Sequence, residues 1–388
     1  MDMLKQSSVL LLQGSILAIS AIIFAQCLSF SFVNWDDNAF LGTPLVRQFP
    51  FSNLFEIFKT HVTGRYYPLT ILAFQIQHYF FHFEPLYYHA VNIVLHLINV
   101  TLVFKILENL RLDKKISALT AFLFAIHPLQ VETVAWVSSF KDLLLSFLFL
   151  WSILIYTRAS RRRVHQYYLL VLYFLALSAK ITAISLPLLF LLFDYCAKKR
   201  IYISDWKEKI PFFILAVFFA ALNLTAVHSA NVFSMSFILP WVDGLWLSGY
   251  ALWLYVLKII FPFSLCNYYP LPAQTQGFFP LKIYFLSLLF IFLSLLALRK
   301  LSHELRVAFL AFIIMISPCL HILKINNCLI YERFVYLPAL GIFFIMSSFM
   351  CSLLTKIQGE KTKYMVSIIT HISFIPHNQL LGTAHGLG

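Results

Sequence analysis

The chain has 388 residues, of which 61% are hydrophobic and 12% charged, and its 29 basic and 16 acidic residues give a formal net charge of +13. Soluble domains are about 45–50% apolar and about 25% charged, so this composition excludes a soluble enzyme, a nucleic-acid-binding domain and a disordered scaffold. The apolar runs are continuous rather than alternating, which excludes a β-barrel and predicts an all-α polytopic membrane protein.

Ten apolar runs are candidates for membrane spans, because about 20 apolar residues cross a hydrocarbon core of about 30 Å. Clusters of Lys and Arg between them, such as 161–163 and 198–200, indicate cytoplasmic loops and place the N-terminus inside. Residues 31–89 then form one large extracytoplasmic loop, and 228–280 form a second one. The predicted spans lie at about 9–30, 90–108, 116–137, 142–157, 167–179, 181–196, 210–227, 281–298, 307–323 and 334–354.

Two adjacent carboxylates, Asp36 and Asp37, follow the first predicted span within a few residues. Adjacent carboxylates repel each other, which favours one of them as a proton acceptor, and the outer membrane boundary gives them access to lipid headgroups and to water. A helix cap or a solvated loop pair is the plainer interpretation. Later in this loop, Arg65 is a cation on the side where few cations are expected, so we interpret it as a candidate for binding an anionic, membrane-borne substrate.

An amphipathic helix is predicted in this loop over Pro68–Phe81. Its His78, together with His82, has a spacing compatible with metal binding, but no third ligand is identifiable. The second predicted span carries four polar residues on one helix face, at i, i+3, i+7 and i+10: His89, Asn92, His96 and Asn99. Such stripes usually hydrogen-bond to neighbouring helices; lining a headgroup cavity is the alternative.

The third predicted span contains His127-Pro128, and the proline disrupts the helix near its outer end. Glu132 follows in the same span, and Lys141 and Asp142 lie at the next turn. Burying a carboxylate without a partner is unfavourable, so Glu132 is a candidate functional residue. The Lys141-Asp142 pair is also compatible with a surface ion pair that adds little stability. We expect these side chains to cluster at the outer end of the span.

Lys180 interrupts the apolar stretch Tyr167–Cys196, which basic clusters flank on both sides. The stretch must therefore cross and return, although its halves reach only about 20–24 Å at 1.5 Å per residue. We expect the turn at Lys180 to lie below the outer headgroup plane and to face a protein-lined cavity. An ionisable residue at that depth is a functional-site hypothesis by default.

The Lys/Arg pattern allows only two of the three apolar runs between residues 210 and 298 to cross. We therefore predict that 245–261 is a juxtamembrane or re-entrant helix, with a missed crossing near Phe233–Val242 as the alternative. Arg333 lies at the outer boundary of the last predicted span, where it binds substrate or extends to the interface. Residues 1–363 form one transmembrane domain in this interpretation, and 364–388 are a tail similar to a truncated span. The six scattered cysteines predict neither a disulfide framework nor a zinc site.

Several motifs, in this order, resemble the membrane region of the transmembrane and tetratricopeptide-repeat proteins, which are GT-C glycosyltransferases, over about residues 20–350. They are Asn34–Asp37, Gly64–Thr70, the polar stripe of the second span, His127–Trp136 with Lys141-Asp142, Lys180 with Leu186-Pro187 and Asp194-Tyr195, Tyr268–Pro270, and Glu332–Pro338. Members of that family carry Glu or Pro where Ile181 stands here. The tetratricopeptide repeats are absent from this chain, so the choice of acceptor is not transferred.

The resemblance implies a GT-C-like bundle of about 10–12 transmembrane helices. It also implies transfer of a sugar, usually mannose, from a polyprenyl-phosphate donor to a hydroxyl acceptor on a protein, lipid or polysaccharide, outside the cytoplasm. We expect inversion at the sugar, in a bacterial inner membrane or the endoplasmic reticulum. The family's catalytic acidic pair maps onto Asp36 and Asp37. Candidate substrate-binding residues are Arg65, His89, His127, Glu132, Lys141, Asp142, Lys180 and Arg333.

We expect no obligatory metal, because fixed cations can neutralise a single phosphate; enzymes of this superfamily vary, so a divalent metal stays open. Two other functions remain compatible with the sequence. A flippase or transporter of lipid-linked sugars also needs a phosphate-binding cavity but needs no general base. A non-catalytic membrane scaffold is suggested by the altered residue after Lys180 and by the missing repeats.

Overall fold

A computed structural model describes residues 2–158, 163–229, 241–321 and 328–373 of the chain. Over these residues the regular structure is helical, with isolated β-bridges and no strand. The longer helices of the first half are α1 (Asp2–Ala25), α4 (Pro68–Phe81), α5 (Pro85–Asn109), α6 (Lys114–Ile126), α8 (Phe140–Arg158), α9 (Arg163–Ala179) and α10 (Leu186–Lys198). Those of the second half are α11 (Ile203–Ser229), α13 (Trp241–Ile260), α14 (Leu281–Lys300), α15 (His303–Ile316) and α16 (Ala339–Ser373).

Shorter elements connect them. These are η1 (Gln26–Ser29), α2 (Asp37–Leu41), η2 (Pro44–Arg47), α3 (Leu54–Lys59), η3 (Pro128–Gln130), α7 (Val131–Ala135), η4 (Val137–Ser139), η5 (Ile181–Ser185), η6 (Ser317–Cys319) and η8 (Glu332–Val335). The all-α polytopic fold predicted from the sequence is confirmed.

Seven helices of the described chain are long and apolar enough to cross a membrane, or eight if the bent pair α6–α7 is one span. This is fewer than the ten predicted spans. The runs at 167–179 and 307–323 fall in α9 and α15, which have 17 and 14 residues and are shorter than the roughly 20 residues that a full span needs. Helix α13 is not among the candidate spans, and the placement of 245–261 at the membrane surface stays a prediction. The alternative crossing near 233–242 lies mostly outside the described residues.

The predicted continuous span 116–137 is wrong in detail. Helix α6 ends at Ile126, and the chain continues through η3 into α7 with a bend of 48°. The residue before a proline is disfavoured in helical conformation, and His127 accordingly adopts an extended conformation. The bend turns Glu132 on α7 away from the axis of α6.

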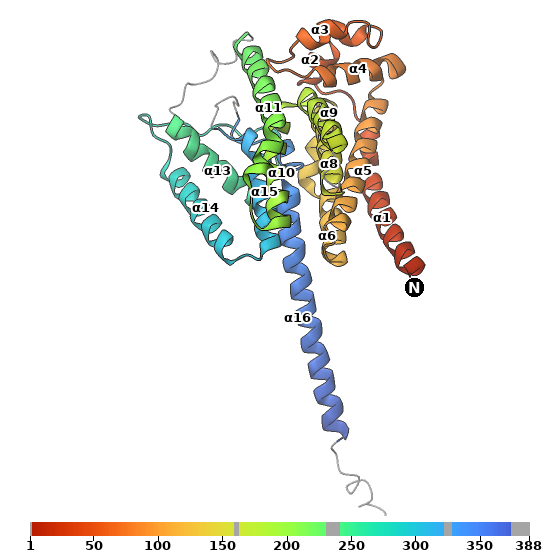
Figure 1. Cartoon of the computed structure of the whole chain (residues 1–388), viewed down its shortest axis with the longest axis vertical. Helices are drawn as coiled ribbons and strands as arrows, with labels where there is room; N and C mark the ends of the chain where they lie inside the picture. The colour runs from red at the N-terminus through yellow and green to blue at the C-terminus, as the bar shows by residue number, and fades with distance from the viewer. Residues whose placement is uncertain (1, 159–162, 230–240, 322–327, 374–388) are drawn as a thin grey trace, which may run out of the picture.

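Helix α5 lies at the centre of one half of the bundle, where it packs on α1, α6 and α8, and α8 packs in turn on α9 (Figure 1). In the other half α13 pairs with α14, and α16 packs on α6 and α15. Helix α16 approaches α15 closely at Gly341, because a Cβ atom there would lie 2.3 Å from the carbonyl oxygen of Ala308. Small residues allow such close contact between membrane helices.

Helices α2, α3 and α4 form a layer, here called the cap, at the end of the bundle opposite the N-terminus (Figure 1). The predicted helix Pro68–Phe81 is confirmed as α4. The hydroxyl of Thr70 on α4 donates a hydrogen bond of 3.0 Å to the carbonyl of Ala179, the last residue of α9. The cap is therefore fastened to the bundle immediately beside Lys180.

Three members of the predicted polar stripe on α5 are buried and bonded to other helices. The amide of Asn92 donates to the carbonyl of Trp136 at 3.0 Å, and that of Asn99 donates to the carbonyl of Leu143 at 3.1 Å. A ring nitrogen of His96 lies 2.7 Å from the hydroxyl of Tyr336. The interhelical interpretation of the stripe is confirmed for these residues.

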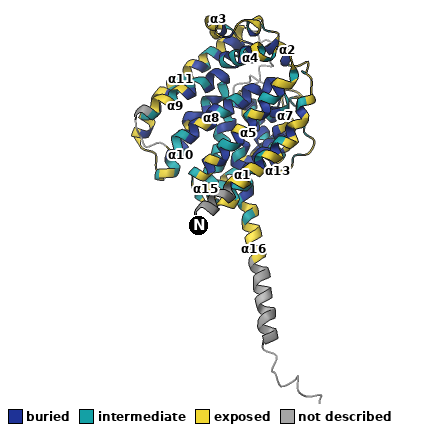
Figure 2. Cartoon of the chain, turned by 90° about the vertical axis from the view of Figure 1, so that its right-hand side faces the viewer, coloured by how far each residue is buried: buried dark blue, intermediate teal, exposed yellow. Residues whose placement is uncertain are grey.

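Helix α16 continues past the predicted end of the last span to Ser373, so the predicted cytoplasmic loop 355–363 is helical instead. Its lower part extends away from the cap and beyond the bundle, where the side chains up to residue 358 are mostly exposed (Figure 2). The predicted boundary between 363 and 364 falls inside this helix. Residues 374–388 of the predicted tail, like Arg161 and Arg162, lie outside the described residues.

Candidate active site

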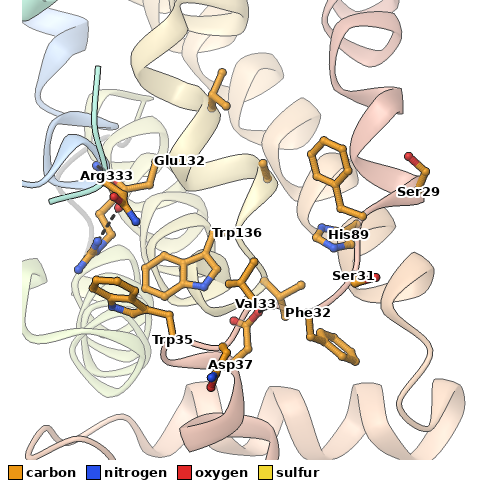
Figure 3. Close-up of a pocket in the computed structure, with 16 residues that line it drawn as sticks. Ser29, Ser31, Phe32, Val33, Trp35, Asp37, His89, Glu132, Trp136 and Arg333 are labelled. Carbon is orange, nitrogen blue, oxygen red and sulfur yellow. Dashed lines mark hydrogen bonds and ion pairs between the residues drawn. The ribbon is translucent and has the colours of Figure 1, made fainter. Parts of the chain in front are cut away.

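A cavity of about 690 Å³ lies next to α2 and is bordered by the segment after η1, by α7 and by η8. Figure 3 shows Arg333 and Glu132 at one end of it, Trp35 and Trp136 between, and His89 with Ser29 at the other end. Most of the wall is apolar. The lining residues are Ser29, Phe30, Ser31, Phe32, Val33, Asn34, Trp35, Asp37, His89, Val131, Glu132, Ala135, Trp136, Val137, Asn267 and Arg333.

The two carboxylates of the first loop lie in different surroundings. The side chain of Asp36 is 29% exposed, and its Oδ2 lies 3.6 Å from Nζ of Lys141. Lys141 is buried on α8, and its ammonium lies 4.5 Å from the ring centre of Phe40 and 5.1 Å from that of Trp136. Aromatic faces stabilise a buried cation, so Lys141 is held in place beside Asp36.

Asp37 is buried and bonded to the protein. Its Oδ2 accepts the N–H of Val33 at 3.0 Å, while Oδ1 accepts the N–H of Ser138 at 2.9 Å and also the hydroxyl of Ser138. These bonds connect the first loop to η4, just before α8. Asp37 therefore supports the geometry of the loop, and it lines the cavity, whereas Asp36 is the more exposed of the two carboxylates but is not part of the cavity lining.

We expect Asp37→Asn to lower the free energy of unfolding by about 1–3 kcal/mol, because an NH₂ group would replace one accepting oxygen and leave a buried donor unpaired. Thermal unfolding of the detergent-solubilised protein measures this. The matched control is Asp113→Asn, since Asp113 caps α6 by accepting the N–H groups of Lys115 and Ile116, a role that Asn fills equally well. Equal unfolding midpoints for the two variants would contradict the structural role of Asp37.

Two further ion pairs lie near the first. Lys180 is extended between α9 and η5, and its ammonium contacts the carboxylate of Asp142 in a pair that is almost completely buried. Arg333 donates from Nη1 to Oε1 of Glu132 at 2.5 Å, and its backbone N–H donates to Oε2 at 2.8 Å. The predicted helix break at Lys180 and the predicted clustering of these charges both agree with the structure.

The phenol of Tyr67 shows that these charges share one region. Burial raises the pKa of Tyr67 to about 12, and four ionic groups act on the same phenol: Arg65, Asp142, Asp36 and Arg333. The pKa of Arg333 is also above its usual value, because the carboxylates of Glu132 and Asp142 outweigh the opposing effect of burial. Arg65, half-buried in the turn that Val62 and Arg65 close, thus belongs to this group of charges.

The two remaining predicted residues, His89 and His127, lie in different surroundings. His89 lines the cavity beside Phe30, with ring centres 6.2 Å apart. His127 does not line it; its ring caps η3 by accepting the N–H of Leu129 and packs against Phe343. Among the described residues no group of three or more His, Cys, Asp or Glu is placed to hold a metal ion, and the six cysteines are free.

No protein-family model matches the chain. The human protein O-mannosyl-transferase TMTC3 is 33% identical over 123 residues, which are 32% of this chain and 12% of that protein. The human protein O-mannosyl-transferase TMTC1 is 32% identical over 152 residues, covering 36% and 17%. The Caenorhabditis elegans protein O-mannosyl-transferase F38B6.6 is 25% identical over 349 residues, covering 84% and 49%.

The homologues of this chain are protein O-mannosyl-transferases. The family resemblance predicted from the motifs is thereby confirmed, and so is the assignment as a multi-pass membrane protein. The matches span about half or less of the length of these O-mannosyl-transferases.

Trp35, Trp136 and Asn267 are among the cavity residues that the sequence analysis did not single out as site candidates. Two of them lie inside the motifs shared with the O-mannosyl-transferase resemblance, and Asn267 directly precedes a third motif. Uncharged residues in apolar surroundings carry no signal in charge or hydropathy, so only the motif positions pointed toward them.

Proposed function

We propose that this chain is the membrane part of a protein O-mannosyltransferase that moves mannose from a polyprenyl phosphate to a protein hydroxyl on the extracytoplasmic side, with inversion. The observation that carries the proposal is the grouping of three ion pairs. Glu132–Arg333 lines the cavity, Asp142–Lys180 lines a small second pocket that Arg333 also borders, and Lys141 of the Asp36–Lys141 pair lies over the ring of Trp136 in the cavity wall. Burying ionised side chains inside an apolar bundle is energetically unfavourable, and in membrane proteins such residues usually mark a functional site. The names of the homologues supply the reaction class.

In the proposed reaction the acceptor oxygen forms a bond to the anomeric carbon of the sugar. The bond between that carbon and the phosphate oxygen breaks, and its electron pair stays on the phosphate. Asp36 takes the acceptor's proton, since its carboxylate is partly open while that of Asp37 is occupied by three hydrogen bonds. Fixed positive charge near the leaving phosphate stabilises the transition state, a role we give to Arg333, Lys180 and Arg65.

The site contains buried polar atoms that suit an absent ligand. Nζ of Lys141 and Oδ2 of Asp142 are buried without a hydrogen-bond partner among the described residues. A ligand phosphate would draw the cations away from their carboxylate partners. The apolar end of the cavity, near Phe30 and His89, lies beside η1 at the end of α1, where a polyprenyl tail can leave toward the lipid.

The test is an assay of the detergent-solubilised chain against a panel of polyprenyl-phosphate sugars with a serine- and threonine-containing acceptor peptide. We expect the mannose donor to be consumed and the peptide to gain one hexose, as seen by mass spectrometry. Donor consumption without a membrane also argues against a flippase, which would leave the donor intact. If every donor remains intact although the protein is folded, the proposal is wrong for this chain.

A further inference from the structure

Trp136 lines the cavity and carries an unpaired donor. Its Nε1 atom is buried and has no hydrogen-bond partner in the described part of the chain. The ring faces two cations, with Cζ of Arg333 4.9 Å and Nζ of Lys141 5.1 Å from its centre. An indole N–H only donates, and leaving it unpaired in the interior is unfavourable. The described residues therefore leave this N–H without an acceptor.

The surroundings of this N–H favour a neutral oxygen over a phosphate. Figure 3 shows the nitrogen-bearing edge of Trp136 directed toward Val33 and the carboxylate of Asp37, while Arg333 lies at the far side of the ring. A negatively charged phosphate would be repelled by Asp37 and attracted to Arg333. A sugar hydroxyl carries no net charge, so Asp37 does not repel it.

Trp35 provides an apolar surface at the same place. It is 52% exposed although it lines the same cavity as Trp136 (Figure 3). A large indole that remains half-exposed in the free protein is available to cover a bound ring. The C–H face of a pyranose is such a ring.

Asn267 adds an amide to the cavity from the segment between α13 and α14. Glu332 holds this segment, since its Oε1 accepts the N–H of Cys266 and the hydroxyl of Tyr269, both at 2.7 Å. Burial raises the pKa of Glu332, and the bond from Tyr269 opposes that rise. A second bond, from the N–H of Leu329 to the carbonyl of Tyr269 at 2.8 Å, fixes the other side of the segment. The backbone on both sides of Asn267 is thus held in place, and the exposed amide of Asn267 has donors and an acceptor that match sugar hydroxyls.

We propose that Trp136, Trp35 and Asn267 form a hexopyranose subsite: the indole N–H of Trp136 donates to a sugar oxygen, Trp35 covers the ring, and Asn267 bonds a hydroxyl. The inference rests on the proposed function, because the sugar is that of the lipid donor. Glu332 is a positioning residue for this subsite. The phosphate is bound separately, at the end of the cavity that Arg333 occupies.

The experiment compares two probes, a short-chain polyprenyl phosphate and its mannosylated form, binding to the full chain in detergent by titration calorimetry. Wild-type protein is expected to prefer the mannosylated probe. Trp136→Phe keeps an aromatic ring for the two cations but removes the N–H, and should weaken the mannosylated probe roughly 5- to 10-fold, the value of one hydrogen bond, while leaving the bare phosphate unchanged. Asn267→Ala should likewise weaken binding of the mannosylated probe alone, and it replaces Trp136→Phe as the test if that variant folds poorly.

Trp206→Phe is the matched control, because Trp206 is 49% exposed on α11 and does not line the cavity. It should alter neither affinity. The proposed sugar subsite is wrong if wild-type protein binds both probes with equal affinity, or if the cavity variants lower the affinity for both probes by the same factor. Either result would leave lipid-phosphate binding supported. If wild-type protein binds neither probe, the proposed function fails and the subsite falls with it.

Discussion

Asp36→Asn is expected to slow sugar transfer by about 10²- to 10⁴-fold, the usual contribution of a positioned general base. The protein should remain folded, because Asn has nearly the same shape as Asp. Although the substitution removes the charge opposite Lys141, the rings of Phe40 and Trp136 continue to stabilise that ammonium. Initial rates with saturating mannosyl donor, together with the unfolding midpoint, measure both expectations.

The control for this variant is Asp243→Asn on α13, where the carboxylate accepts a hydrogen bond from Gln274 outside the cavity. It should retain wild-type rates. Undiminished transfer by the Asp36→Asn protein would remove the base assignment, and a comparison with Asp37→Asn would then show whether the buried carboxylate acts instead.

Lys180→Met is expected to lower the free energy of unfolding by about 3–5 kcal/mol, the effect of breaking a buried ion pair and leaving one charge without compensation. The partner, Asp142, is almost completely buried. The double variant Lys180→Met/Asp142→Leu should recover most of this loss, because it removes both charges. If Lys180 binds the phosphate, the double variant should still lack the stabilisation that the mannosyl donor gives to the wild-type protein. Thermal unfolding with and without donor separates the two effects.

A second buried pair offers the control. Lys209 on α11 donates to Asp194 on α10 at 3.0 Å, and neither residue lines the cavity or the small pocket that Asp142, Lys180 and Arg333 border. Lys209→Met should destabilise the protein in the same way but preserve stabilisation by the donor. A Lys180→Met protein that unfolds at the wild-type midpoint would show that the ion pair contributes nothing.

Hydropathy and charge alone predicted much of the fold. The bounds of α4, the interruption at Pro128 and the break at Lys180 follow from local rules, since proline, amphipathic spacing and an isolated charge act on the chain near them. The number of spans was harder to predict. Two apolar runs form helices of 17 and 14 residues, because buried helices in a bundle can be apolar without crossing the whole bilayer.

The members of the charged group were also predictable, because an ionisable residue in an apolar chain is conspicuous wherever it stands. Their pairing was not. Glu132 and Arg333 are separated by 201 residues, and Asp142 and Lys180 by 38. No local pattern distinguishes Asp36 from Asp37. In the structure, however, Ser138 donates hydrogen bonds to the carboxylate of Asp37, while the carboxylate of Asp36 remains partly exposed.

The sequence by itself therefore determined that this is a helical membrane protein with a group of charges concentrated near particular breaks in its helices, since burial and helix termination depend on neighbouring residues. Only the tertiary structure decided which carboxylate is partly exposed, that His127 caps a turn outside the cavity, and that the N–H of Trp136, a residue of the cavity wall, is unpaired. These properties depend on contacts between segments far apart in the chain, which no periodicity in the sequence encodes.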